Sequence, residues 1–182
     1  SLIIKLKKHW NAKINDLFFS EIKKIMGNHL KEEYTCYMTD KVVGAYFGNT
    51  EITINYTKDM HVETGSFILA EEILHLVYWQ VWKDIYKKNI SNIDEIFSIG
   101  KGKWSCWHIA EIIPEYLLVE NSIFKKFGWK KQKRYLYYTW IPELRKILNP
   151  IWENKKDFRG FIIKTHEKLN CTPKNAESNI QI

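Results

Sequence analysis

The pattern of apolar and polar positions divides the 182-residue chain into helix-like and strand-like stretches. Residues 2–30 carry apolar side chains at helical spacing with lysines between them, and Gly27 predicts where this helix stops. From residue 34 the period changes to two, and turn-forming residues separate three short β-prone runs, 34–38, 42–47 and 51–56. This order predicts a three-stranded antiparallel meander after the first helix.

A loop over residues 57–66 then leads into a strongly apolar stretch. Thr64 and Ser66 are both residue types that cap helices, so we expect a long helix to begin beside one of them and to run to about Lys88. The stretch is too short, and carries too many ionisable side chains, to cross a membrane.

Further helices are predicted in the last part of the chain, over residues 104–127, 135–152 and 157–169. Pro114 lies inside the first of them and is expected to kink it or to mark a new first turn. We therefore predict an α+β fold with a small antiparallel sheet followed by a helical bundle. A single domain is expected over residues 1–169, and a polar, disordered tail over 170–182.

Three ionisable residues interrupt the long apolar helix: Glu71, Glu72 and His75. Their spacings of three and four place them on one side of the helix. Burying one unpaired carboxylate costs several kcal/mol, which is comparable to the stability margin of a whole domain. These residues are therefore paired, bind a ligand, or face a cleft.

The second apolar helix repeats this arrangement, because His108, Glu111 and Glu115 again share one side. We expect the two helices to face each other across a cleft, with residues 51–56 as an edge or near-edge strand beside it. The two helices together would then offer imidazole and carboxylate groups at a spacing that suits a metal ion.

The motif EEILH at residues 71–75 resembles the HExxH motif of the zincin metallopeptidases, with Glu71 in place of the first histidine. Zincins place a small antiparallel sheet before the active-site helix, and its edge strand pairs with an extended peptide; residues 51–56 hold that place here. Gluzincins take a third ligand, a glutamate, from a later helix. The stretch HIAEIIPEYLL is similar to that helix, with Glu111 at the ligand position, and the resemblance covers about residues 50–120.

The resemblance implies metal-assisted hydrolysis of a peptide or protein substrate. Glu72 would be the catalytic general base, and Glu71, His75 and Glu111 would hold a divalent ion. The resemblance implies that this ion is zinc. Glutamate in place of histidine makes the ligand set more negative and favours harder ions such as Mn²⁺ or Fe²⁺. Alternatively His108 replaces the missing imidazole, and the sequence does not choose between these ligand sets.

Three other interpretations stay open. The zincin-like scaffold has lost its metal and its activity, or Glu71 and Glu72 form ion pairs and His75 is an ordinary core residue. The ExxH spacing of Glu72 and His75 also occurs in di-iron helical bundles, but the predicted sheet has no place in that architecture.

The net charge of +7 at first favours a nucleic-acid partner. The chain is also rich in Ile and Asn, which indicates an A/T-rich codon bias and weakens that argument. Residues 124–140 interleave Lys and Arg with aromatics, as single-strand nucleic-acid surfaces do. The alternative function is therefore a non-catalytic protein that binds nucleic acid or a protein partner; aromatics packed in the core remain the favoured interpretation of this stretch.

The three cysteines lie far apart and form no CxxC motif. No disulfide framework is expected, and with no recognisable signal peptide or membrane span the composition favours the cytoplasm. No pattern indicates the substrate or the oligomeric state.

Overall fold

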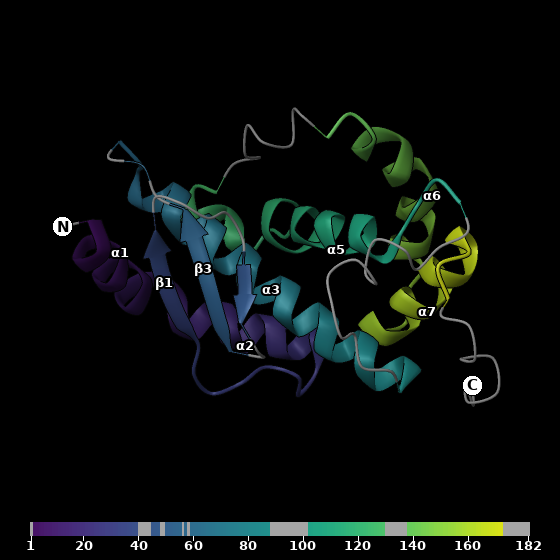
Figure 1. Cartoon of the computed structure of the whole chain (residues 1–182), viewed down its shortest axis with the longest axis horizontal. Helices are drawn as coiled ribbons and strands as arrows, with labels where there is room; N and C mark the ends of the chain where they lie inside the picture. Colours follow the sequence, from purple (N-terminus) through teal and green to yellow (C-terminus); the bar gives the residue numbers. More distant parts are fainter. Residues whose placement is uncertain are drawn as a thin grey trace. The chain divides into compact units, whose positions relative to one another are not determined.

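The computed structural model describes residues 2–39, 45–47, 50–55, 57, 59–87, 102–129 and 138–172. The fold is α+β, with helices and one three-stranded sheet (Figure 1). The chain groups into two compact units, Ser1–Val77 with Pro114–Gln132, and Tyr78–Ile113 with Lys133–Ile182. The single domain over 1–169 stays a prediction, and most of the predicted tail, from residue 173, lies outside the described residues.

The N-terminal helix of the first unit ends where the sequence predicts. It consists of α1 (Leu2–His9), a π-helical turn η1 (Trp10–Ile14) and α2 (Asn15–Met26). Gly27 follows with φ of 78°, a left-handed conformation that a side chain would strain.

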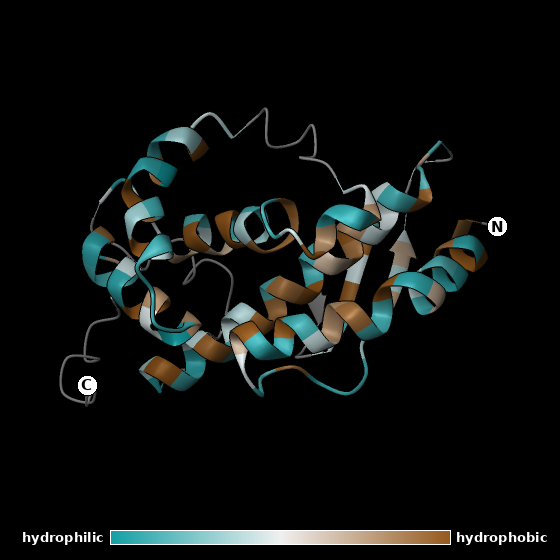
Figure 2. Ribbon diagram, turned by 180° about the vertical axis from the view of Figure 1, so that it is seen from behind, coloured by the Kyte–Doolittle hydropathy of each residue, from teal (hydrophilic) through white to brown (hydrophobic). Residues whose placement is uncertain are grey.

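The π-helical turn explains how this long helix keeps one buried face. Its buried side chains recur strictly every fourth position, at Leu6, Trp10, Ile14, Phe18, Ile22 and Met26. In an α-helix of 3.6 residues per turn, each step of four advances the stripe by roughly 40° around the axis. The wider π turn rotates it back and corrects the drift. Figure 2 shows apolar and polar residues alternating along this helix.

The sheet contains β1 (Thr35–Thr39), β2 (Ala45–Phe47) and β3 (Glu51–Asn55) in the order β1-β3-β2. The three strands lie where the sequence predicts them, but β1 pairs with β3 in parallel and only β2 with β3 is antiparallel. The predicted antiparallel meander is therefore wrong.

Residues 51–56 are expected as an edge or near-edge strand, and β3 is not an edge: it is the central one of the three described strands, next to both edges. Ile52, Thr53 and Ile54 are all buried, so both faces of β3 are covered. The alternation of apolar and polar side chains indicated one covered face only. A fully covered strand suits the middle of a sheet, where both of its edges are also paired.

The long apolar helix α3 (Val62–Tyr86) begins before the predicted caps. The Ser66 hydroxyl donates to the Glu63 carbonyl at 2.9 Å and accepts from the Trp129 indole at 3.0 Å. It therefore contributes to packing inside the helix and is not a cap. No helix in the described part of the chain is both long and apolar enough to cross a membrane.

Aromatic side chains far apart in sequence form the core of the first unit. The Phe124 ring lies 6.0 Å from Phe18 and 5.8 Å from Trp129, and Trp129 lies 6.0 Å from Phe67. Phe124 belongs to a short 3-10 turn, η3 (Phe124–Phe127). These contacts join the N-terminal helix, the start of α3 and residues 124–129.

Pro114 changes the type of helix. α5 (Cys106–Pro114) is followed directly by a π-helical turn, η2 (Glu115–Val119). Since proline has no N–H and its ring occupies the place of a helical hydrogen bond, the widened turn after it relieves the mismatch.

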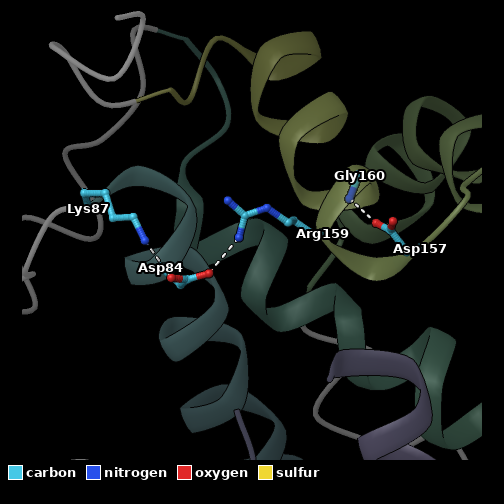
Figure 3. A network of polar contacts seen from close by, with 5 residues as sticks. All are labelled: Asp84, Lys87, Asp157, Arg159 and Gly160. Carbon is cyan, nitrogen blue, oxygen red and sulfur yellow. Dashed lines mark hydrogen bonds and ion pairs between the residues drawn. The ribbon is translucent and has the colours of Figure 1, made fainter. Parts of the chain in front are cut away.

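The second unit contains α6 (Ile141–Glu153) and α7 (Phe158–Leu169). α7 begins at Asp157, whose carboxylate accepts from the Gly160 N–H at 2.6 Å (Figure 3). Asp84 near the end of α3 binds both Lys87 and Arg159 at 2.7 Å. Both ion pairs are solvent-exposed, so they orient these helix ends more than they stabilise them.

A buried polar cluster occupies the core of the second unit. His166 Nδ1 lies 3.2 Å from the Cys171 carbonyl, which can only accept, so Nδ1 carries the proton. Nε2 then accepts from the Tyr78 hydroxyl at 3.0 Å, while Cys106 Sγ lies 3.7 Å from Nδ1. Burial lowers the pKa of His166 to about 4 even though the bond to Cys171 opposes this.

This cluster predicts acid sensitivity. An unfolded histidine takes up a proton near pH 6.5, whereas His166 stays neutral in the folded protein down to about pH 4. The unfolded state therefore binds more protons in this window, and the free energy of unfolding should fall by about 2–3 kcal/mol from each such histidine as the pH drops from 6.5 to 4. Urea denaturation across this range measures the fall.

In His166→Gln the fall should become shallower; His75, whose pKa burial also lowers to about 4, still contributes to it, whereas Glu111, whose pKa burial raises to about 7, opposes it. Replacement of the exposed His61 by Gln is the matched control and should leave the profile unchanged. An identical fall in wild type and His166→Gln would contradict the assignment.

Candidate metal site

Helix α3 carries three of the predicted site residues in consecutive turns. Glu71 is 0%, Glu72 4% and His75 2% exposed, so all three are removed from solvent. Ile73, Leu74 and Val77 are buried on the same helix. Because β-branched and aromatic residues are frequent in α3, burial of its apolar side chains stabilises the helix more than intrinsic propensity does, and the spacing of three and four then aligns the polar groups.

Burial keeps His75 neutral. Its pKa is lowered to about 4 by desolvation, so at neutral pH one ring nitrogen of the imidazole is unprotonated. A neutral imidazole is the form that binds metal ions, and no proton has to be displaced first.

Glu72 lies close to the first strand of the sheet. Burial and then the charge of Glu72 raise the pKa of the Cys36 thiol, in β1, to about 11. Cys36 is therefore a protonated thiol at neutral pH, and Glu72 lies near enough to act on it electrostatically.

Glu111, in α5, has a pKa close to neutrality. It is 9% exposed, and desolvation raises its pKa to about 7. Side-chain hydrogen bonds from Trp107 and Tyr138 oppose this rise, because they favour the ionised carboxylate. Trp107 lies one helical turn before Glu111, a spacing visible in the sequence; nothing in the sequence indicates Tyr138.

His108 has a structural role at the start of α5. Its Nδ1 accepts from the Ser105 N–H at 3.1 Å and lies 2.9 Å from the Ser105 hydroxyl. Since a backbone N–H can only donate, Nδ1 is unprotonated and Nε2 carries the proton in the neutral ring. His108 thus closes the first turn as in a capping box, with no lone pair left on Nε2 for a metal.

Among the described residues, one group has the spacing of a metal site: one ligand atom from each of Glu71, His75 and Glu111 lies within 4.8 Å of the others. These are the three ligands that the sequence predicts. His108, Glu72 and Glu115 are not part of this group, although Glu115 is only 1% exposed. Glu72 lies on the same helix as Glu71 and His75 but outside this group, and its role as general base stays a prediction.

Comparisons of the chain with protein-family models, curated proteins and solved structures found no match. The resemblance to zincins therefore depends on residues 71–75 and on Glu111, and it stays a prediction.

The environment of Glu111 makes a testable prediction in the metal-free protein. In Tyr138→Phe one hydrogen bond to the carboxylate is lost, so the pKa of Glu111 should rise above the wild-type value of about 7. Carboxyl ¹³C chemical shifts from pH 4 to 9 measure it. Tyr86→Phe, in the same unit, is the control and should leave the titration unchanged; an unchanged midpoint in Tyr138→Phe would refute the contact.

Proposed function

We propose that the chain is a divalent-metal-dependent hydrolase of zincin-like type that acts on peptides. The observation that carries the proposal is the approach of Glu71, His75 and Glu111 ligand atoms to within 4.8 Å of one another. Each of the three residues is nearly or fully buried, so a bound cation would offset part of the cost of removing their charges from water.

The chemistry of the three donors fits a divalent ion. Zinc ligands lie about 2.0–2.2 Å from the ion, hence roughly 3–4 Å from one another, so a small closing movement of the side chains would complete the site. One neutral imidazole and two carboxylates balance a charge of two. Zn²⁺ is the first expectation, and the two oxygen ligands also suit Mn²⁺ or Fe²⁺.

Within this proposal Glu72 is the catalytic residue. A bound ion would polarise the scissile carbonyl. It would also lower the pKa of a water molecule, so that the water could be deprotonated and attack this carbonyl. Glu72 follows Glu71 directly and precedes His75 by three positions, an offset that would set its carboxylate beside a bound ion. It would accept the proton of the attacking water and deliver it to the leaving amine.

The alternative of a nucleic-acid-binding protein finds less support. Phe124 is 0% and Trp129 7% exposed, and both are packed in the core, so neither ring offers a face on which a base could stack. Residues 130–137 of the basic aromatic stretch lie outside the described residues.

Metal binding and catalysis should separate in two variants. His75→Ala should lower zinc affinity at least tenfold and remove hydrolysis, because it deletes a ligand. Glu72→Gln should keep the metal but lower kcat by about 10²–10⁴, because an amide cannot accept the proton. Elemental analysis, chelator competition and cleavage of a quenched-fluorescent peptide library measure these effects.

Glu115→Gln is the matched control, since Glu115 is buried but outside the ligand group. It should retain metal and activity. If wild type and His75→Ala bind zinc equally, the metal site is refuted; if metal binds but no peptide is cleaved, the chain is a metal-binding scaffold and not a hydrolase.

Glu71→His tests the residue that departs from the HExxH motif. If Glu71 is a ligand, an imidazole there should raise zinc affinity by about tenfold or more and shift the preference from Mn²⁺ toward Zn²⁺. Competition against a chelator for both ions measures this. Unchanged affinity together with lower stability would exclude Glu71 from the ligand set.

A further inference from the structure

The first unit contains a groove of about 500 Å³ beside the sheet. It is lined by α1, α2, β1 and α3 together with the segment before β1, and its apolar side chains include Leu6, Trp10, Met38, Leu69 and Ile73. This volume is in the range of ligand-binding clefts. Ile3, which also lines it, is 53% exposed, so the apolar surface continues to the mouth of the groove.

Within the described ranges, no strand pairs with the outer side of β1. Its one strand neighbour among the described residues is β3. The Thr35 N–H donates to the Thr50 carbonyl at 2.9 Å, so Thr35 points its backbone groups toward β3. In a parallel ladder this direction alternates from residue to residue, so the N–H and C=O groups of Cys36 and Met38 point away from the sheet. Figure 1 shows β1 at the edge of the sheet next to α1.

The residues with outward-pointing backbone groups also line the groove. Cys36 and Met38 are both part of its wall and are both half-buried. Hydrogen-bonding groups that repeat every second residue, roughly 6.6 Å apart, match another extended chain better than a compact ligand. Such a chain could place alternate side chains among the apolar residues of the groove.

The charged side chains at the rim favour one orientation of a bound ligand. Glu32 and Glu33 are exposed and line the end that precedes β1, while the exposed Lys7 lies on α1. The segment with the two glutamates is held in place, because the Tyr34 ring stacks on Phe19 at 5.9 Å and its hydroxyl accepts from the Lys31 N–H. A positive charge on a ligand is therefore favoured at this end.

We propose that β1 binds an extended peptide by strand addition, with alternate apolar side chains in the groove and a basic residue against Glu32 and Glu33. The site is formed by the first unit alone and needs no metal ion. It therefore does not rest on the proposed hydrolase activity.

The experiment uses the full chain and the probe acetyl-Thr-Val-Thr-Val-Thr-Val-Lys-amide with a fluorescein label. Fluorescence anisotropy measures saturable binding, and single N-methyl groups are placed at each amide in turn. In strand addition every second amide pairs with β1, so alternate N-methyl groups should weaken binding about tenfold while the others have little effect. An affinity that does not depend on the position of the N-methyl group would overturn the proposal. The absence of saturable binding to the wild-type protein would overturn it too.

Two protein variants locate the site. Met38→Pro removes one outward N–H and leaves the ladder to β3 intact, a position where edge strands tolerate proline, and should weaken binding about tenfold. Because this variant could still disturb the strand, Glu32→Lys combined with Glu33→Lys changes exposed residues only. It should reverse the preference between the Lys-ended probe and a Glu-ended probe.

The control is Tyr37→Ala, which removes a side chain that does not line the groove. It should bind the probe as wild type does. If the charge-reversed variant keeps the preference for lysine, the peptide binds elsewhere and the proposal fails. If sedimentation instead shows that the chain dimerises through β1 and excludes the probe, the occupant is a second copy and the proposal also fails.

Discussion

The cost of removing ionisable groups from water is the constraint on which the rest of this structure depends. Helix α3 carries two carboxylates and an imidazole at no more than 4% exposure. The same desolvation keeps His75 neutral and raises the pKa of Glu111 to about 7. Burial thus leaves His75 in the form that binds a cation, whereas Glu111 would have to release a proton first; a bound cation would then offset part of the cost of burying the carboxylates.

The positions of most helices and strands could be predicted from the sequence, because they follow from local periodicity and from stop signals such as Gly27. The order of the strands could not. β1 and β3 are separated by β2 along the chain, and their parallel pairing depends on long-range packing around Ile52 and Ile54. Short intervening segments favour a meander by default, so the local pattern pointed to the wrong neighbour.

For the candidate site, helical spacing predicted which residues share a face on α3 and α5. It left Glu71 and His108 as alternative ligands. The choice between them depends on a local contact: the Ser105 N–H donates to His108 Nδ1, so the His108 ring takes part in the helix cap. Tyr138 could not be predicted, because no periodicity relates it to Glu111, 27 positions earlier. The start of α3 at Val62 was missed for a different reason, since cap-prone residues such as Thr64 also occur inside helices once tertiary contacts satisfy them.

The π-helical turn at Trp10–Ile14 marks the place where the N-terminal helix can lose a residue. A π turn is what remains when one residue is inserted into an α-helix without breaking it. The wide turn takes up roughly the 100° that one α-helical residue adds, so the helix on either side keeps its register. Loss of the codon for an exposed residue there would restore regular α-helix and leave Phe18, Ile22 and Met26 on the same side as Leu6. In-frame deletion within this turn should therefore be tolerated better than a deletion in the regular helix on either side of it.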